Sequence, residues 1–155
     1  MYQAVWKLGK SDFSLIEQIR NEVFVDGFGI KESLEFDNLD AISAHVLVTY
    51  EDGDPIATAR MFPFDNNTRI GRIAVRERYE GMGYDDLVLR LLLYKAKSLS
   101  GKFVTTTAMD FERPLLTKFG FKECGRPFTW CSFSLTPMQL LTSEIDLSGE
   151  CEHKD

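Results

Sequence analysis

The chain has 155 residues and a mass of 17.7 kDa, which suits one domain with a buried core. Its 18 lysines and arginines against 24 aspartates and glutamates give a net charge of −6, which argues against nonspecific binding to nucleic acid and against docking on anionic membrane. No apolar run approaches the roughly 20 residues of a membrane helix, and the first residues lack the layout of a signal peptide. We therefore expect a cytoplasmic protein.

The cysteines and histidines are too few and too scattered for a metal site. There are three cysteines, an odd number without a Cys-x-x-Cys pair, and only two histidines, His45 and His153. A disulfide scaffold or a structural zinc site would need more of these residues at closer spacing. We expect neither, and we expect no metal.

The first half of the chain predicts a strand, a helix and a three-stranded antiparallel meander. Ser11 and Asp12 suit the cap of a helix that runs to about Val25. Two turn signals, 52–54 and 66–67, separate strands rich in β-branched residues. In chain order, we expect a strand at 2–8, the helix, an acidic loop with one short helical turn at 30–42, and strands at 45–50, 56–64 and 68–75.

The second half predicts two helices that alternate with strands. Apolar residues at helical spacing begin at Tyr84, and Gly101 ends that helix. We expect a strand at 102–107, a helix at 111–119, strands at 121–124 and 128–135, and a tail. The domain then covers 1–136, and the tail 137–155 is partly disordered. The order predicts an α+β fold with a mixed, mostly antiparallel, twisted sheet flanked by helices.

A loop with two glycines lies between a strand and a helix. Gly81 and Gly83 permit the left-handed backbone that turns successive amides toward one point. The helix that follows starts with unpaired amides and a partial positive charge, and Arg78 adds a charged group. The segment therefore suits a phosphate or pyrophosphate, although two glycines also suit an ordinary helix cap.

Three motifs in order carry a family resemblance. Residues 78–83, Arg-x-x-Gly-x-Gly, resemble the acyl-CoA-binding motif of the GCN5-related N-acetyltransferases (GNAT). Residues 115–121, which end in Gly120-Phe121, resemble the helix-to-strand signature of that family. Residues 19–25, with Glu35-Phe36-Asp37 and His45, are similar to the small bacterial branch typified by ElaA and YjcF. The resemblance spans about residues 2–135.

The resemblance implies that the chain uses acetyl-CoA as cosubstrate. The backbone of 73–75 would pair with the pantetheine arm, and a backbone amide near Ala74 or Val75 would stabilise the tetrahedral intermediate. The amides of the loop and of the next helix would hold the pyrophosphate. The implied cofactor residues are Ile73, Ala74, Val75, Arg78, Tyr79, Glu80, Gly81, Met82, Gly83 and Tyr84.

The sequence departs from the family pattern at two places. Many members have a tyrosine, the general acid, where this chain has Leu116. Asp85 and Asp86 follow the loop and would repel a pyrophosphate unless they point away. These departures leave open a second function, a non-catalytic module that binds CoA or another anionic ligand.

The acidic loop supplies candidates for the catalytic base and for acceptor contacts. Glu35 is the first candidate base and His45 the alternative, because a carboxylate or an imidazole can take a proton from an amine. Asp37 and Arg72 are candidate acceptor contacts, although Arg72 suits a cross-strand ion pair equally well. The loop carries four acids at 32–40 and no lysine or arginine after Lys31, so its negative charge predicts a cationic acceptor.

The predicted function is transfer of an acetyl group from acetyl-CoA to a primary amine of a small molecule by direct attack in a ternary complex. We expect no nucleic-acid or membrane partner. Leu89 and Leu93 suit either the core or a homodimer surface, and the sequence does not separate the two.

Overall fold

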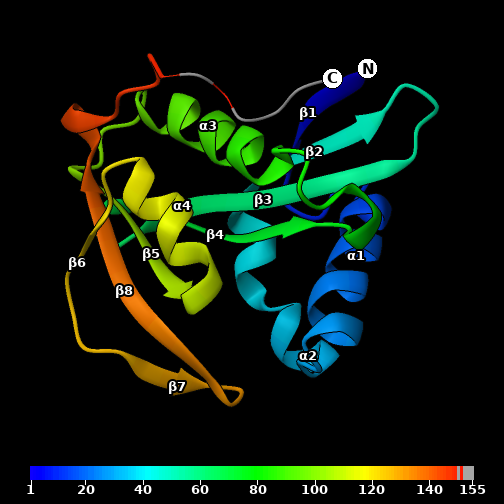
Figure 1. Cartoon of the computed structure of the whole chain (residues 1–155), viewed down its shortest axis with the longest axis horizontal. Coiled ribbons are helices and arrows are strands. Elements are labelled where there is room, and N and C mark those ends of the chain that lie inside the picture. Colours follow the sequence, from blue (N-terminus) through cyan, green and yellow to red (C-terminus); the bar gives the residue numbers. More distant parts are fainter. Residues whose placement is uncertain (150, 152–155) are drawn as a thin grey trace.

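The computed structural model describes residues 1–149 and 151 and shows an α+β fold (Figure 1), as the sequence predicts. Its eight-stranded sheet has the order β1-β2-β3-β4-β5-β8-β6, and β7 pairs with β8. The strands are β1 (Tyr2–Leu8), β2 (Ala44–Tyr50), β3 (Pro55–Phe64), β4 (Asn67–Val75), β5 (Phe103–Met109), β6 (Lys122–Glu123), β7 (Phe128–Trp130) and β8 (Phe133–Leu141). The α-helices are α1 (Ser14–Arg20), α2 (Glu32–Glu35), α3 (Tyr84–Ala96) and α4 (Arg113–Lys118).

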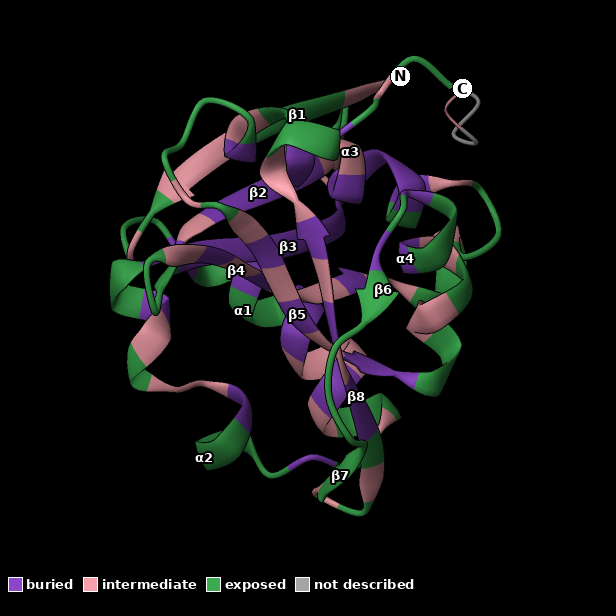
Figure 2. Ribbon diagram, turned by 90° about the vertical axis from the view of Figure 1, so that its left-hand side faces the viewer, coloured by how far each residue is buried: buried purple, intermediate pink, exposed green. Residues whose placement is uncertain are grey.

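Helices cover both faces of the sheet (Figures 1 and 2). Helices α3 and α4 cover one face, where Leu89 and Leu93 are fully buried in the larger core. Helix α1 covers the other face through Ile16 and Ile19. Leu89 and Leu93 therefore belong to the core, and a homodimer stays a prediction. None of the described helices is long and apolar enough to cross a lipid bilayer.

The sheet separates in its middle. β4 and β5 are the one parallel pair of neighbours among the described strands, and their register joins only Thr68 to Val104 and Arg69 to Thr105. Beyond these residues the two strands diverge, as Figure 1 shows. A parallel pair needs a long crossover, which α3 supplies here. The result is a gap between a half-sheet β1–β4 and a half-sheet β5–β8.

β4 also carries a bulge beside this gap. Arg60 of β3 pairs with Gly71 and Thr58 pairs with Ala74, so three steps along β4 oppose two along β3. Arg72, within the bulge, has a left-handed φ of 52°. Such bulges redirect side chains and are frequent beside active sites. The bulge breaks the strict alternation of side chains along the part of β4 that borders the gap.

The first predicted helix differs from the prediction in its cap and its length. Asp12 has a φ of 51° and pairs with Lys7 at 2.6 Å, while the helix begins after Phe13 without a side-chain cap. α1 ends at Arg20 and continues as a π-helix, Asn21–Gly27. The acidic loop holds two short helical segments, α2 and the 3₁₀ helix Asn38–Ile42, where one was expected.

The C-terminal strands need a larger correction. The strand predicted at 128–135 is a hairpin, because Cys131 and Ser132 have positive φ values and form its turn. The domain boundary expected after residue 136 falls within β8. Proline is unusual within a strand, yet Pro137 lies in β8 and pairs with Thr107 of β5. Residue 150 and residues 152–155, part of the expected disordered tail, lie outside the described residues.

Candidate active site

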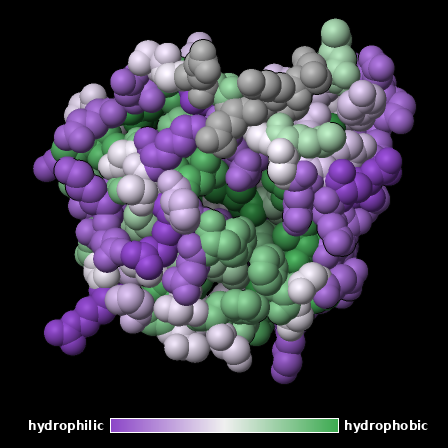
Figure 3. All heavy atoms as spheres, in the orientation of Figure 1, coloured by the Kyte–Doolittle hydropathy of each residue, from purple (hydrophilic) through white to green (hydrophobic). Residues whose placement is uncertain are grey.

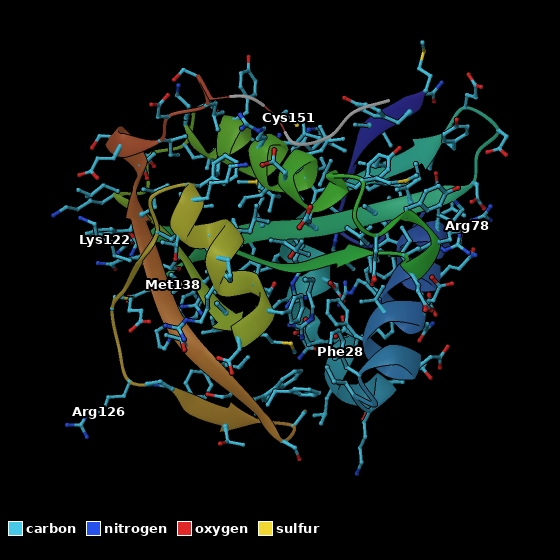
Figure 4. All side chains as sticks on the ribbon, viewed as in Figure 1. Phe28, Arg78, Lys122, Arg126, Met138 and Cys151 are labelled. Atoms are coloured by element: carbon cyan, nitrogen blue, oxygen red, sulfur yellow. The ribbon has the colours of Figure 1, made fainter. Side chains whose placement is uncertain are left out.

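The loop between β4 and α3 has the geometry of an anion cradle. Gly81 and Gly83 have φ values of 78° and 81°, and Gly83 precedes α3 without a side-chain cap. A Cβ at Gly81 would meet nothing within 4 Å, so the space beside it is open. Arg78 is 66% exposed and lies at the outer edge of the loop (Figure 4). A turn with two left-handed glycines at a helix N-terminus, with a cation beside it, suits a phosphate group.

Side chains of the preceding hairpin fix this loop. Tyr79 Oη donates a hydrogen bond to Asp54 Oδ2 at 2.5 Å, and Arg76 Nη1 donates to the carbonyl oxygen of Pro55 at 2.9 Å. Arg76 also pairs with Glu22 at 3.2 Å, which ties the loop to the π-helix. The protein's own side chains therefore hold the cradle in this conformation.

A cavity of about 320 Å³ opens beside the cradle, and we call it the cofactor cavity. Phe28 lines this cavity, and its label lies between α4 and the helices near the N-terminus in Figure 4. The space-filling view from the same side shows an apolar area on this face of the molecule (Figure 3). Six predicted cofactor residues line it: Ile73, Val75, Tyr79, Glu80, Gly81 and Tyr84. Ala74 faces the core under α1, and Arg78, Met82 and Gly83 are not among the lining residues.

The two aspartates at the start of α3 point in different directions. Asp86 is buried and pairs with Arg90 at 2.6 Å and with Lys118 at 2.8 Å. Burial opposes its ionisation, but the hydrogen bonds of Lys118 and Arg90 prevail and lower its pKa. Asp86 is therefore neutralised inside the protein, which is the case in which no repulsion of a pyrophosphate is expected. Asp85 is exposed and lines the cofactor cavity, and its Oδ1 accepts from the Asp86 amide at 2.9 Å.

A second cavity, of about 440 Å³, lies between α2, β4 and β7, and we call it the acceptor cavity. It brings together three predicted residues, Glu35, Asp37 and Arg72. Phe128 and Trp130 of β7 also line it. The hairpin of β7 and β8 positions these two aromatic residues beside the cavity.

A buried ion-pair network forms the wall of the acceptor cavity at α2. Its members come from α1, the acidic segment, β3 and β4: Arg20, Glu35, Asp37, Asp40, Arg60 and Arg72. Arg20 Nε donates to Glu35 Oε2 at 2.7 Å, and Arg20 Nη1 donates to Asp40 Oδ1 at 2.6 Å. These three side chains are almost fully buried. Such a network is costly to break, because each partner left alone is a buried charge.

Arg60 and Arg72 complete the network from the strands. Arg60 donates two hydrogen bonds to Asp37, at 2.7 and 3.0 Å, and one to Asp40 at 2.9 Å. Arg72 Nε lies 3.0 Å from Glu35 Oε2, and its guanidinium lies 5.4 Å from the Trp130 ring. Burial raises the pKa of Asp37, but the hydrogen bonds and charge of Arg60 outweigh it, and the net pKa is low.

The network changes the interpretation of Glu35. Burial raises the pKa of its carboxyl, while the charges of Arg72 and Arg20 oppose that rise. One carboxylate oxygen, Oε2, lies within ion-pair distance of both guanidiniums. This arrangement is typical of a structural anchor. The acids Glu35, Asp37 and Asp40 are paired with arginines, so they do not supply the unopposed negative field on which the expected preference for a cationic acceptor rests.

His45 lies apart from both cavities. Its side chain is buried on β2, its Nε2 lies 3.2 Å from the Asp40 carbonyl oxygen, and its ring packs edge-on against Phe13. Burial lowers its pKa. His45 is not among the residues that line the acceptor cavity, so it is not placed to act on an acceptor there. The structural interpretation of this histidine fits the geometry, and the catalytic one does not.

Glu112 is a candidate base that the sequence analysis missed. It ends the 3₁₀ turn after β5 and lines the acceptor cavity, and its Oε1 accepts a hydrogen bond from the Met109 amide at 2.9 Å. Burial raises its pKa to about 7, against the opposing effects of that hydrogen bond and of the Arg72 charge. A carboxylate with a pKa near the working pH is well suited to proton transfer. The one sequence signal was its position, between a strand and a helix that has Pro114 in its first turn.

The two cavities are neighbours. At three places consecutive residues divide between them: Val23 with Phe24, Arg72 with Ile73, and Phe111 with Glu112. Val23, Ile73 and Phe111 line the cofactor cavity, whereas Phe24, Arg72 and Glu112 line the acceptor cavity. All three places lie around the gap between β4 and β5. A group that enters from the cofactor cavity therefore meets the acceptor cavity at this gap.

A sequence model of the acetyltransferase (GNAT) family matches residues 13–121, which include the cradle and both sides of the gap. The chain belongs to the GNAT family. It is 31% identical over 94 residues to the UPF0039 protein C11D3.02c of Schizosaccharomyces pombe. That alignment covers 59% of this chain and 63% of the relative, less than two thirds of the relative's length.

Solved GNAT-like structures share the fold. ElaA of Escherichia coli superimposes with a TM-score of 0.77 at 20% identity, over 89% of this chain and 99% of that one. An acyl-CoA N-acyltransferase from Pseudomonas aeruginosa superimposes with a TM-score of 0.80 at 21% identity, over 90% and 99%. These matches confirm the GNAT fold and the likeness to ElaA.

The described residues contain no group of three or more histidine, cysteine, aspartate or glutamate side chains that could hold a metal ion. The absence of a metal from the reaction stays a prediction. The GNAT family and fold support an acyltransferase activity, to which the residues of the two cavities can now be assigned.

Proposed function

We propose that this protein transfers an acetyl group from acetyl-CoA to a primary amine of a small molecule, with both substrates bound at once. One observation carries the proposal: the cofactor cavity with its anion cradle adjoins the acceptor cavity at the gap between β4 and β5. Two adjacent cavities suit two substrates held for direct reaction, because positioning supplies much of the rate enhancement. The likeness to an acyl-CoA N-acyltransferase supports the cosubstrate.

The residues of the cofactor cavity fit acetyl-CoA. The backbone of the loop around Gly81 and the N-terminus of α3 would hold the pyrophosphate, with Arg78, which also pairs with Asp54 at 3.4 Å, as counter-ion. Ile73 and Val75 would flank the pantetheine arm on the side of β4 from which β5 has diverged. When bound, acetyl-CoA supplies an acyl carbon activated as a thioester.

We assign the base to Glu112 rather than to Glu35 or His45. The amine nitrogen forms the new bond to the acyl carbon, and the bond from carbon to sulfur breaks. Glu112 takes the proton from the nitrogen, directly or through one water. Leu116 stands where many relatives have a tyrosine that acts as the general acid, and it is buried in the core. In this proposal CoA therefore leaves as the thiolate and takes its proton from water.

Acetyl-CoA should stabilise the protein and release CoA in an amine-dependent way. At a concentration 100 times the dissociation constant, the gain is about 2.7 kcal/mol, which raises the Tm by about 5 °C or more. Thermal shift measures binding, and a thiol reagent measures CoA release with and without a mixed panel of amines. Binding without release would favour the non-catalytic module, and no shift at millimolar acetyl-CoA would remove the cosubstrate.

Gly81→Val should abolish the thermal shift by acetyl-CoA while the protein stays folded. Valine is strained at a φ of 78° and its branched side chain would fill the open space of the cradle. Gly120→Val is the control, because Gly120 has a φ of 97° at the end of α4 and does not line the cofactor cavity. A Cβ there would lie 3.2 Å from a methyl group of Leu140, so the control should lose at least as much stability and keep the shift. If Gly81→Val binds acetyl-CoA normally, the loop is only a turn.

A further inference from the structure

Arg69 is a cation without an acidic partner in the acceptor cavity. It lies on β4, paired with Thr105 of β5, just before the strands diverge. Among the described residues, no carboxylate lies within 4.0 Å of its guanidinium, and its buried Nε has no hydrogen-bond partner. Its guanidinium lies 4.6 Å from the Phe64 ring, a contact that leaves its hydrogen-bond donors unused.

The other two arginines of the cavity differ from Arg69. Arg60 is held by Asp37 and Asp40, and Arg72 is held by Glu35 and Asp37. Burial lowers the pKa of Arg69. The opposing influence comes from Cys124 and not from a carboxylate. An arginine stays charged under such conditions, and a partly buried charge is costly unless an anion pairs with it.

Arg69 and Glu112 line the cavity from different levels of β5, because Arg69 pairs with Thr105 whereas Glu112 follows the end of that strand and bonds to the Met109 amide. Glu112 lies beside Phe111, which lines the cofactor cavity, so the reacting amine belongs beside Glu112. Arg69 precedes the cofactor residue Ile73 by four positions on β4, roughly 13 Å of strand. An acceptor with its amine at Glu112 would therefore direct its opposite end toward Arg69.

We propose that the acceptor is an amino acid or a related amine with a carboxylate, and that Arg69 binds that carboxylate. This inference rests on the proposed acetyl transfer. A guanidinium forms paired hydrogen bonds with a carboxylate. A phosphate fits less well, because the single guanidinium without an acidic partner would balance only one of its two negative charges.

The test compares amines that differ only by the carboxylate. We would measure kcat/KM for lysine against cadaverine and for 4-aminobutanoate against propylamine, with phosphoethanolamine as the phosphate arm. The wild type should favour the carboxylate member of at least one pair by about 10-fold or more, mainly through KM. Arg69→Met should abolish that preference and leave the carboxylate-free amines and the acetyl-CoA thermal shift unchanged. Arg126→Met, an exposed loop variant (Figure 4), should behave as wild type.

Several outcomes would overturn the inference. They are equal rates within both pairs, a preference for phosphoethanolamine, or an equal loss on all acceptors in Arg69→Met. If no amine is acetylated, the CoA-bound protein is titrated with the same compounds by calorimetry, and binding of the carboxylate members that Arg69→Met abolishes would still support it. Absence of such binding would reject it. A missing thermal shift with acetyl-CoA would instead reject the proposed function.

Discussion

Glu112→Gln should lower kcat by about 100-fold, because glutamine cannot take the proton of the attacking amine. Glutamine keeps an oxygen that can accept the hydrogen bond from the Met109 amide, so the turn after β5 should persist. The wild-type kcat/KM should rise as pH increases through about 7, where Glu112 loses its proton. This rise should disappear in the variant. Steady-state rates across a pH series measure both effects.

Two further measurements separate this role from a structural one. The folded-state pKa of Glu112 is raised, so its contribution to stability is full below its unfolded value of about 4.5 and is lost as pH rises through about 7. Glu112→Gln should therefore be more stable than wild type at pH 8, by on the order of 1–3 kcal/mol. Glu144→Gln, an exposed control, should change neither rate nor stability. An unchanged rate in Glu112→Gln, or loss of the pH limb in Glu35→Gln instead, would return the base to Glu35.

Glu35→Ala should destabilise the fold by about 3–5 kcal/mol, because it leaves the buried Arg20 and the half-buried Arg72 without their shared carboxylate. The Tm should fall by roughly 10 °C. Thermal unfolding monitored by circular dichroism measures the change. Glu32→Ala removes an exposed carboxylate from the same short helix, α2, and should cost less than about 0.5 kcal/mol. Equal costs for the two variants would show that Glu35 anchors nothing.

The fold and the anion cradle were predictable because the residues that determine them lie close together in the sequence. Strand patterns, turn residues and the spacing of Gly81 and Gly83 each act within a few positions of the chain. The cradle needs two residues with left-handed backbone before a helix, and the two glycines at these positions indicate such a backbone. The C-terminal hairpin was missed because Cys131 and Ser132 are not usual turn residues, and Pro137 is unusual in a strand.

The acceptor cavity was less predictable because its determinants are distant in sequence. The acids of the loop were visible, but Arg20, Arg60 and Arg72 pair with them across 15 to 37 positions. No local pattern shows which acids remain unpaired, so Glu35 seemed available and the loop seemed able to attract a cation. Glu112 was missed for a related reason, since its pKa depends on burial that the fold creates.

The narrow seam between β4 and β5 has a mechanical consequence. Two residue pairs join the half-sheets, and beyond these pairs β4 and β5 diverge and border the gap (Figure 1). In the proposed function, a substrate bound in the gap would contact both half-sheets and set their separation. The substrate that binds first would then set the width of the space that the second one enters, so we expect the two binding events to be coupled without any moving lid.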